Sequence, residues 1–153
     1  MRGVAGLLVT FLMQACSMDN KEPALHFVHP NGLSLRLPIA LSAQQLPDGF
    51  IVDLAASRES RTPEQVTVVL HKGASEPEGE WPEKRVVSGR VFSYRMEQDK
   101  GGSGGEVYVL VAWCPYPGGY VRLEQVSQAE WPTAPNESLI WNVMAAISEP
   151  QSR

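Results

Sequence analysis

Apolar and polar residues alternate along much of the chain, which is the pattern of strands that bury one face. The clearest case is the run 33–37, in which every second residue is Leu and the residues between are polar. An apolar run at 25–29 precedes it, and the Pro-Asn-Gly sequence at 30–32 is a strong turn signal. These features predict that the folded part of the chain opens with a β-hairpin.

Further strands are predicted by runs rich in β-branched and aromatic residues, at 50–54, 66–70, 86–96, 107–113 and 120–126. We expect the run 86–96 to be broken or bent near Gly89, because glycine inside a strand pattern often marks such a position. The run 107–113 is apolar on both faces, which is typical of a central strand that is covered on both sides.

The longer connectors differ in composition. The connector 38–49 is expected to hold one helical turn, because the sequence at 42–45 has the spacing of a capping box. Acidic residues with Gly and Pro fill 73–83, which predicts a solvated loop. Gly and Ser dominate 98–105, and a strand rather than a helix follows this stretch. We therefore expect a flexible hairpin loop there and not a phosphate cradle.

The C-terminal region is predicted to be a helix. Four apolar residues fall at the i, i+3, i+4 and i+7 positions of one stripe, namely Ile140, Val143, Met144 and Ile147. Asn136 is the expected N-cap, and Pro150 ends the helix. The predicted class is therefore α+β, an antiparallel sheet with a C-terminal helix packed on one face.

The N-terminus has the pattern of an export signal. Arg2 gives a positive start, an apolar run follows at 4–13, and Ala15 then precedes Cys16. We expect 1–15 to be a signal peptide. This end resembles the lipobox of bacterial lipoproteins, which implies that Cys16 is acylated. The alternative is an ordinary secretory signal with a chance cysteine.

The expected organisation after cleavage is simple. Residues 16–24 would form the lipidated cysteine and a polar tether, 25–149 a single globular domain, and 150–153 a tail. After residue 15, no apolar run is long enough to be predicted as a membrane-spanning helix.

Charge and cysteine content narrow the function classes. The net charge is −4, and removal of the segment with Arg2 leaves 12 basic against 17 acidic residues, or −5. This acidic balance without a basic cluster argues against nucleic-acid binding. Cys16 and Cys114 are the two cysteines, so a lipid on Cys16 leaves Cys114 unpaired. We expect Cys114 to be a buried inert thiol rather than a nucleophile.

The sequence holds little that predicts catalysis. His26 and His29 are three residues apart, which places them on opposite faces of a strand, and no further ligands complete a metal site. No serine nucleophile motif is present. A small hydrolase is therefore the weakest hypothesis, and no metal or cofactor is expected.

A binding surface is the stronger hypothesis. Tyr116, Tyr120, Trp81 and Trp131 lie in or beside predicted loops, where aromatic residues often anchor protein interfaces. The alternative for the two tryptophans, each followed by Pro, is that they cover edges of the core.

Four motifs in order resemble a known family. They are the runs 27–38, 47–50, 101–105 and 125–130, which together span most of the chain after the lipobox. In this order they resemble the immunity lipoproteins that protect Gram-negative bacteria against a type VI secretion muramidase effector. The resemblance implies a Mog1/PsbP-like sandwich of helices on an antiparallel sheet.

The resemblance also implies a function. Such a protein binds the secreted peptidoglycan muramidase, occludes its active-site groove and catalyses nothing. Its lipid holds it in the periplasm, at the outer membrane rather than the inner one, and it is a monomer when free. The expected partner-binding residues are Asp99, Gly102, Ser103, Gly104, Tyr116, Tyr120, Ser127, Gln128 and Glu130. Two alternatives remain: the Gly-Ser loop is mere slack, or the protein is an accessory lipoprotein in envelope assembly.

Overall fold

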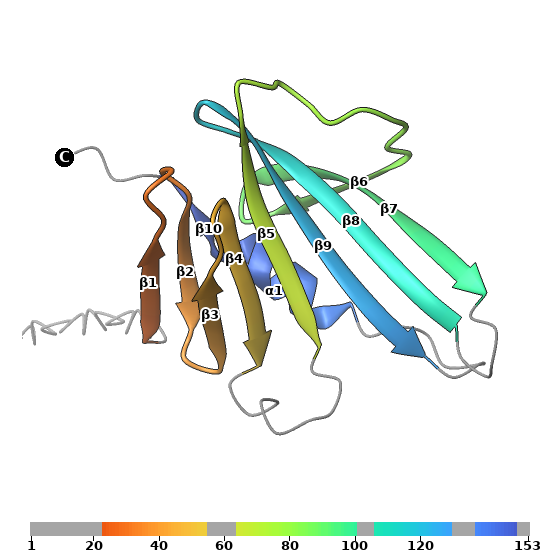
Figure 1. Cartoon of the computed structure of the whole chain (residues 1–153), viewed down its shortest axis with the longest axis horizontal. Coiled ribbons are helices and arrows are strands. Elements are labelled where there is room, and N and C mark those ends of the chain that lie inside the picture. Colours follow the sequence, from red (N-terminus) through yellow and green to blue (C-terminus); the bar gives the residue numbers. More distant parts are fainter. Residues whose placement is uncertain (1–22, 55–63, 101–105, 130–136, 150–153) are drawn as a thin grey trace, which may run out of the picture.

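A computed structural model describes residues 23–54, 64–100, 106–129 and 137–149 (Figure 1). The elements in chain order are β1 (Ala24–Val28), β2 (Ser34–Pro38), β3 (Leu41–Gln45), β4 (Gly49–Leu54), β5 (Gln65–Lys72), β6 (Glu83–Val87), β7 (Arg90–Lys100), β8 (Glu106–Tyr116), β9 (Gly119–Ala129), α1 (Ser138–Ala146) and β10 (Ile147–Ser148). The predicted signal peptide, Cys16 and the tail at 150–153 lie outside the described residues. No helix of the described part is long and apolar enough to cross a membrane.

The strands form two antiparallel sheets. The large sheet has the order β3-β4-β5-β9-β8-β7-β6, and the small sheet has the order β1-β2-β10. Figure 1 shows α1 behind the large sheet, and we call the face that α1 covers the inner face and the opposite one the outer face. The chain thus has the predicted antiparallel sheet with a C-terminal helix on one face. The Mog1/PsbP-like likeness stays a prediction.

Alternation in the sequence decides which side chains enter the core. The predicted opening hairpin is present, since β1 pairs with β2, and the three alternating leucines have no exposed surface. The core also takes every second residue of the central strands and one face of α1: Val66, Val68, Leu70, Leu110, Ala112, Cys114, Val121, Leu123, Leu139, Ile140, Val143 and Met144. These side chains bury the apolar surface whose removal from water stabilises the fold.

A buried glutamine connects the sheet to the helix. Gln125 lies on the inner face of β9 with 1% of its surface exposed. Its Oε1 accepts the backbone N–H of Ile140 at 3.0 Å, and its Nε2 donates to Ser127 Oγ at 3.1 Å. The first N–H groups of a helix have no partner within the helix. Glu137 at the N-cap makes no side-chain cap, so a sheet residue supplies an acceptor.

Tyr116 joins the small sheet to the large one. Its hydroxyl accepts the backbone N–H of Ser34 at 3.2 Å. The same oxygen lies 2.9 Å from the carbonyl oxygen of Ser148 and 3.1 Å from that of Gly32, to which it can donate. Only 5% of Tyr116 is exposed, and burial raises the pKa of its hydroxyl. One polar group in the interior therefore fixes how β2 and β10 sit on β8.

Three expectations about local structure were wrong. The connector 38–49 holds the strand β3 rather than a helical turn, because β3 pairs with β4 along its whole length. Ser42 Oγ donates to the side chain of Asp53 across this pair, so it does not cap a helix. Tertiary pairing here outweighs a four-residue capping pattern.

The break that the sequence predicts near Gly89 is present, whereas the other two corrections concern where elements end. The run 86–96 forms parts of β6 and β7, joined by a tight turn at Ser88 and Gly89, both of which have positive φ. The expected loop at 98–105 is shorter, since β7 continues to Lys100 and β8 begins at Glu106. α1 also ends at Ala146, and the buried Ile147 belongs to β10 instead.

Replacing Tyr116 with Phe tests the link between the sheets. The ring is kept, but the Ser34 N–H and the carbonyl oxygens lose their buried partner. We expect the free energy of unfolding to fall by about 1–3 kcal/mol, the usual cost of leaving buried polar groups unpaired. Denaturant unfolding measures this.

Tyr94→Phe is the matched control, because the Tyr94 ring packs edge-on against Trp141 and the variant retains that contact. An equal loss of stability in the two variants would show that the Tyr116 hydroxyl does not link the sheets.

Candidate functional site

The open end of the strands β7, β8 and β9 gathers several of the predicted partner-binding residues. Asp99 pairs with Val107, and Val107 pairs with Gln128, so these three positions form one row across the sheet. Neighbouring strands lie about 4.8 Å apart, so the row spans ~10 Å. The structure thus brings Asp99 and Gln128 to the same end as the 101–105 connection. Gly102, Ser103, Gly104 and Glu130 lie outside the described residues.

Three other predicted residues are buried. Tyr116 and Tyr120 were expected in or beside loops, but both lie in strands, with 5% and 7% of their surface exposed. They also sit at the opposite end of β8 and β9, since Tyr120 is eight residues, or about 27 Å of strand, from Gln128. Ser127 is 7% exposed and bonds Gln125 on the inner face. These three side chains therefore present little surface to a partner.

Aromatic side chains cover one half of the outer face. Trp81, from the connection between β5 and β6, packs edge-on against Trp113 with ring centroids 6.4 Å apart. Trp113 contacts Tyr120 at 5.9 Å, and Tyr120 stacks on His71 at 4.7 Å. Trp81 thus packs on the outer face, and whether it serves as a cover or as an anchor for a partner stays a prediction. Trp131 lies outside the described residues.

Arginine holds this cover in place. The Arg95 guanidinium lies 4.5 Å from the centre of the Trp81 ring, and its Nε is 2.8 Å from a carboxylate oxygen of Glu97. A cation over an indole face is an attractive contact. The part of the outer face around Trp81 and Trp113 is thus closed by packing within the chain, whereas Val126 toward the 101–105 connection is exposed.

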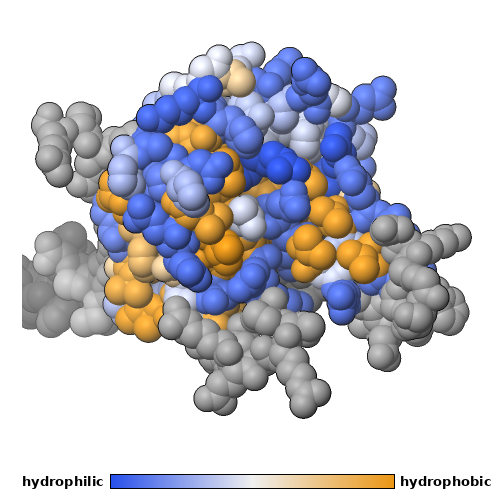
Figure 2. Space-filling model, in the orientation of Figure 1, coloured by the Kyte–Doolittle hydropathy of each residue, from blue (hydrophilic) through white to orange (hydrophobic). Residues whose placement is uncertain are grey.

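The open half carries a line of valines that sequence reasoning did not single out. We call Val107, Val109, Val111 and Val126 the valine stripe; the first three alternate along β8, and Val126 is paired with Val109 from β9. Val126 is 51% exposed, while Val111 is 2% exposed between Arg95 and Glu124 of the neighbouring strands. Figure 2 shows apolar side chains across this face among polar ones.

Polar groups border the valine stripe. Arg122 Nη2 donates to Glu124 Oε2 at 2.7 Å, and these two residues with Thr67 and Val69 line a hollow of about 160 Å³. Glu97 flanks the stripe on β7, where it pairs with Val109, and exposed Gln128 follows Val126 by two residues. An apolar centre with a polar rim is the usual anatomy of a protein interface. The signal in the sequence was the run 107–113, which is apolar on both faces although a helix covers only one.

The histidines His26 and His29 make structural contacts within the described part of the chain. No group of three His, Cys, Asp or Glu side chains within them could hold a metal ion. His29 Nδ1 accepts the Asn31 N–H at 3.1 Å and its Nε2 lies 2.8 Å from the carbonyl oxygen of Leu46, so this buried histidine ties two turns together. His26 Nε2 is 2.8 Å from Ser34 Oγ, but Ser34 is 1% exposed and out of reach of a substrate.

Cys114 is a core residue, as predicted. It has no exposed surface, and burial raises the pKa of its thiol to about 11, although nearby Arg90 opposes the rise. The thiolate, which is the reactive form, is therefore scarce at neutral pH.

Comparison with known proteins identifies relatives of this chain. Residues 34–148, from β2 to β10, match the type six secretion immunity 3 domain. The immune protein Tsi3 of Pseudomonas aeruginosa (strain PAO1) is 28% identical over 145 residues, which cover 94% of this chain and 96% of that protein.

A solved structure shares the fold alone. The crystal structure of a protein from Bacteroides thetaiotaomicron VPI-5482 superposes with a TM-score of 0.56 at 10% identity, over 81% of this chain. The chain spans about half of that protein, 47% of its length, so the match carries no functional argument. The domain match extends through both sheets and the helix, and the chain belongs to the type six secretion immunity 3 family, whose members are type VI secretion immunity proteins.

Proposed function

We propose that this immunity protein neutralises a cognate secreted muramidase by binding across the enzyme's glycan groove, and that it catalyses no reaction itself. The observation that carries the proposal is the family match over residues 34–148. A type VI immunity protein implies a secreted effector as its partner. That the effector cleaves peptidoglycan is our proposal from the resemblance of the sequence motifs.

The valine stripe supports the proposed mode of binding. A half-exposed valine at 126 beside the alternating valines of β8 gives an apolar centre, and Glu97 and Gln128 give it a polar border. Such a surface loses unfavourable contact with water when a partner covers it. The same end of the sheet leads into the 101–105 connection, so a groove that receives this connection would also bring its walls onto the stripe.

Glycine and serine suit a segment that enters a glycan groove. Glycine has no side chain, so its backbone can approach a surface closely, and a serine hydroxyl can replace a sugar hydroxyl as donor and acceptor. Gly102, Ser103 and Gly104 provide this chemistry, with Asp99 and Gln128 in the adjoining row of the sheet and Glu130 just beyond β9.

The proposal also includes where in the cell the protein acts. The muramidase would act on peptidoglycan in the periplasm, so the immunity protein must be present there. A lipid on Cys16 would keep it there, at the outer membrane.

The first test places a charge on the valine stripe. Val126→Glu should weaken neutralisation of the cognate effector at least about tenfold, or ~1.4 kcal/mol, because a partner would have to bury the new carboxylate. Clearing of peptidoglycan suspensions by the effector measures this. Val86→Glu is the matched control, since Val86 is 67% exposed on the edge strand β6 and lies off the stripe.

Equal neutralisation by these two variants would place the interface elsewhere. If even the wild-type chain fails to inhibit or bind the cognate effector, the alternative that the protein is an accessory lipoprotein of the envelope would be favoured.

The second test shortens the 101–105 connection to a two-residue turn. Stability should change little, because the cost of closing a loop varies slowly with its length. Inhibition should weaken at least about tenfold, or ~1.4 kcal/mol, if this connection enters the groove. Thermal unfolding and inhibition are measured on the same preparation, with Pro117→Ala, in the turn at the opposite end of β8 and β9, as the control. Full inhibition by the shortened chain would show that the connection is slack.

The third test concerns the lipid. Cys16→Ser should move the protein from the membrane fraction to the soluble periplasmic fraction, because the acyl chains would supply the anchoring free energy. Cell fractionation with immunoblotting measures the shift. Membrane association equal to that of the wild type would contradict lipidation at Cys16.

A further inference from the structure

Apolar side chains gather where the chain enters the fold. β1 begins at Ala24, which pairs with Pro38, so the turn between β2 and β3 lies at the same end of the molecule. Ile39 in this turn is 57% exposed, and Leu25 beside it is 47% exposed. Leu54 ends β4 opposite the start of β3 and is 37% exposed. We call Leu25, Ile39 and Leu54 the anchor-side patch. Figure 2 shows apolar surface at the lower left of the molecule.

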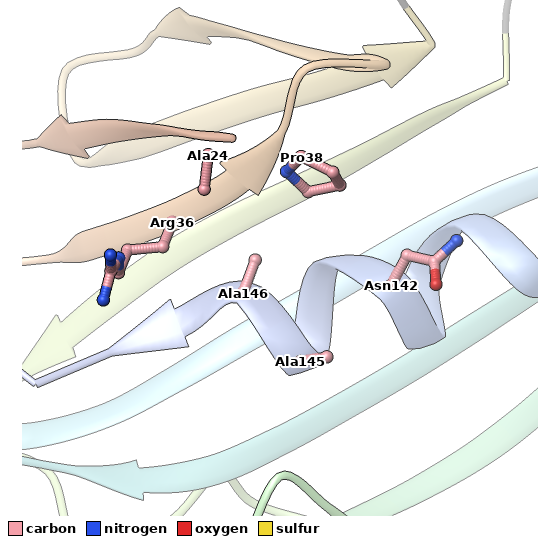
Figure 3. A pocket seen from close by; sticks show the side chains of 6 residues that line it. All are labelled: Ala24, Arg36, Pro38, Asn142, Ala145 and Ala146. Atoms are coloured by element: carbon pink, nitrogen blue, oxygen red, sulfur yellow. The ribbon is translucent and has the colours of Figure 1, made fainter. Parts of the chain in front are cut away.

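The composition around the patch is unusual for a surface turn. The segment 38–41 reads Pro-Ile-Ala-Leu, and 23–25 reads Pro-Ala-Leu, with no carboxylate in either. Carboxylates adjoin the patch in the sequence, because Glu22 precedes Pro23 and Asp53 precedes Leu54. The cation of β2 is Arg36, which is exposed. It lines a hollow of about 250 Å³ together with Ala24, Pro38, Asn142, Ala145 and Ala146 (Figure 3). Arg36 pairs with His26 and Leu25 pairs with Leu37, so Arg36 lies on the other face of the hairpin from Leu25. The patch itself is apolar, as expected of a surface that contacts the acyl layer of a membrane interface.

The tether limits where this end can lie. Six residues, 17–22, separate Cys16 from Pro23. Seven steps of extended chain span at most about 25 Å. An acylated Cys16 would therefore hold the anchor-side patch within that distance of the bilayer, whereas the far turn of the hairpin at 29–33 would lie farther away.

We propose that the anchor-side patch rests on the phospholipid bilayer, with Ile39 and Leu25 among the headgroups and the upper acyl chains. This inference rests on the proposed lipid at Cys16. The mature chain carries a net charge of −5, so its attraction to an anionic surface is weak overall and the contact is mainly apolar. It orients the domain and leaves the valine stripe, on β8 and β9, free for a partner.

Spin labels on the full lipidated protein test the orientation. Ile39→Cys and, as the matched control, Val86→Cys are labelled in the lipidated chain, reconstituted in vesicles of phosphatidylethanolamine and phosphatidylglycerol. Cys114 is buried, so any label on it would give a background signal that does not depend on the lipid. At position 39 we expect collisions with a water-soluble nickel chelate to fall several-fold and collisions with oxygen to rise, relative to position 86. High salt should leave this difference unchanged.

Equal nickel accessibility at the two positions would overturn the proposal, and so would a difference that high salt abolishes. Mass spectrometry that finds no acyl chain on Cys16 would overturn it as well. Leu25→Cys gives a second reading if the Ile39 variant unfolds. Neutralisation of the effector is measured on the same proteins: its absence in the wild type would refute the proposed function while the depth of the label still decides the membrane contact.

Discussion

The length mismatch between the helix and the strands it covers shapes this molecule. β7, β8 and β9 each have 11 residues, or about 37 Å, whereas α1 has nine residues, or about 14 Å. The helix therefore buries only the middle of the inner face. The strand ends project beyond the helix, which is why Met96 on the inner side is partly exposed. The open end that we assign to the partner is a consequence of this mismatch.

Two buried polar groups keep the short helix and the small sheet in register with the large one. Gln125 accepts a hydrogen bond from the first turn of α1, and Tyr116 bonds the backbone of β2 and β10. Apolar packing alone is tolerant of sliding, whereas a buried hydrogen-bonding group is costly to leave unpaired. These contacts fix the projecting strands relative to the end where the chain enters the fold.

The two halves of the outer face differ in how far side chains of the same chain cover them. Trp81, Trp113 and Arg95 close one half by packing within the chain. The valine stripe leaves the other half apolar and partly open, at the end away from that cover. An immunity protein needs a rigid surface for its partner, since ordering a loose one would reduce the affinity. The aromatic cover stiffens the same strands that carry the stripe.

The sequence by itself determined most of the strands, the opening hairpin, the C-terminal helix and the burial of the core thiol, because alternation and helical periodicity record which face of each element is buried. It also placed Asp99 and Gln128 among the candidate residues, which the structure brings into one row. Tertiary structure alone decided the rest. β3 exists because β4 offers it a partner, and Tyr116, Tyr120 and Ser127 are buried because of how the strands pair and pack. The valine stripe stays partly open because α1 covers only one face of a strand that is apolar on both, and periodicity cannot report which face lacks a cover.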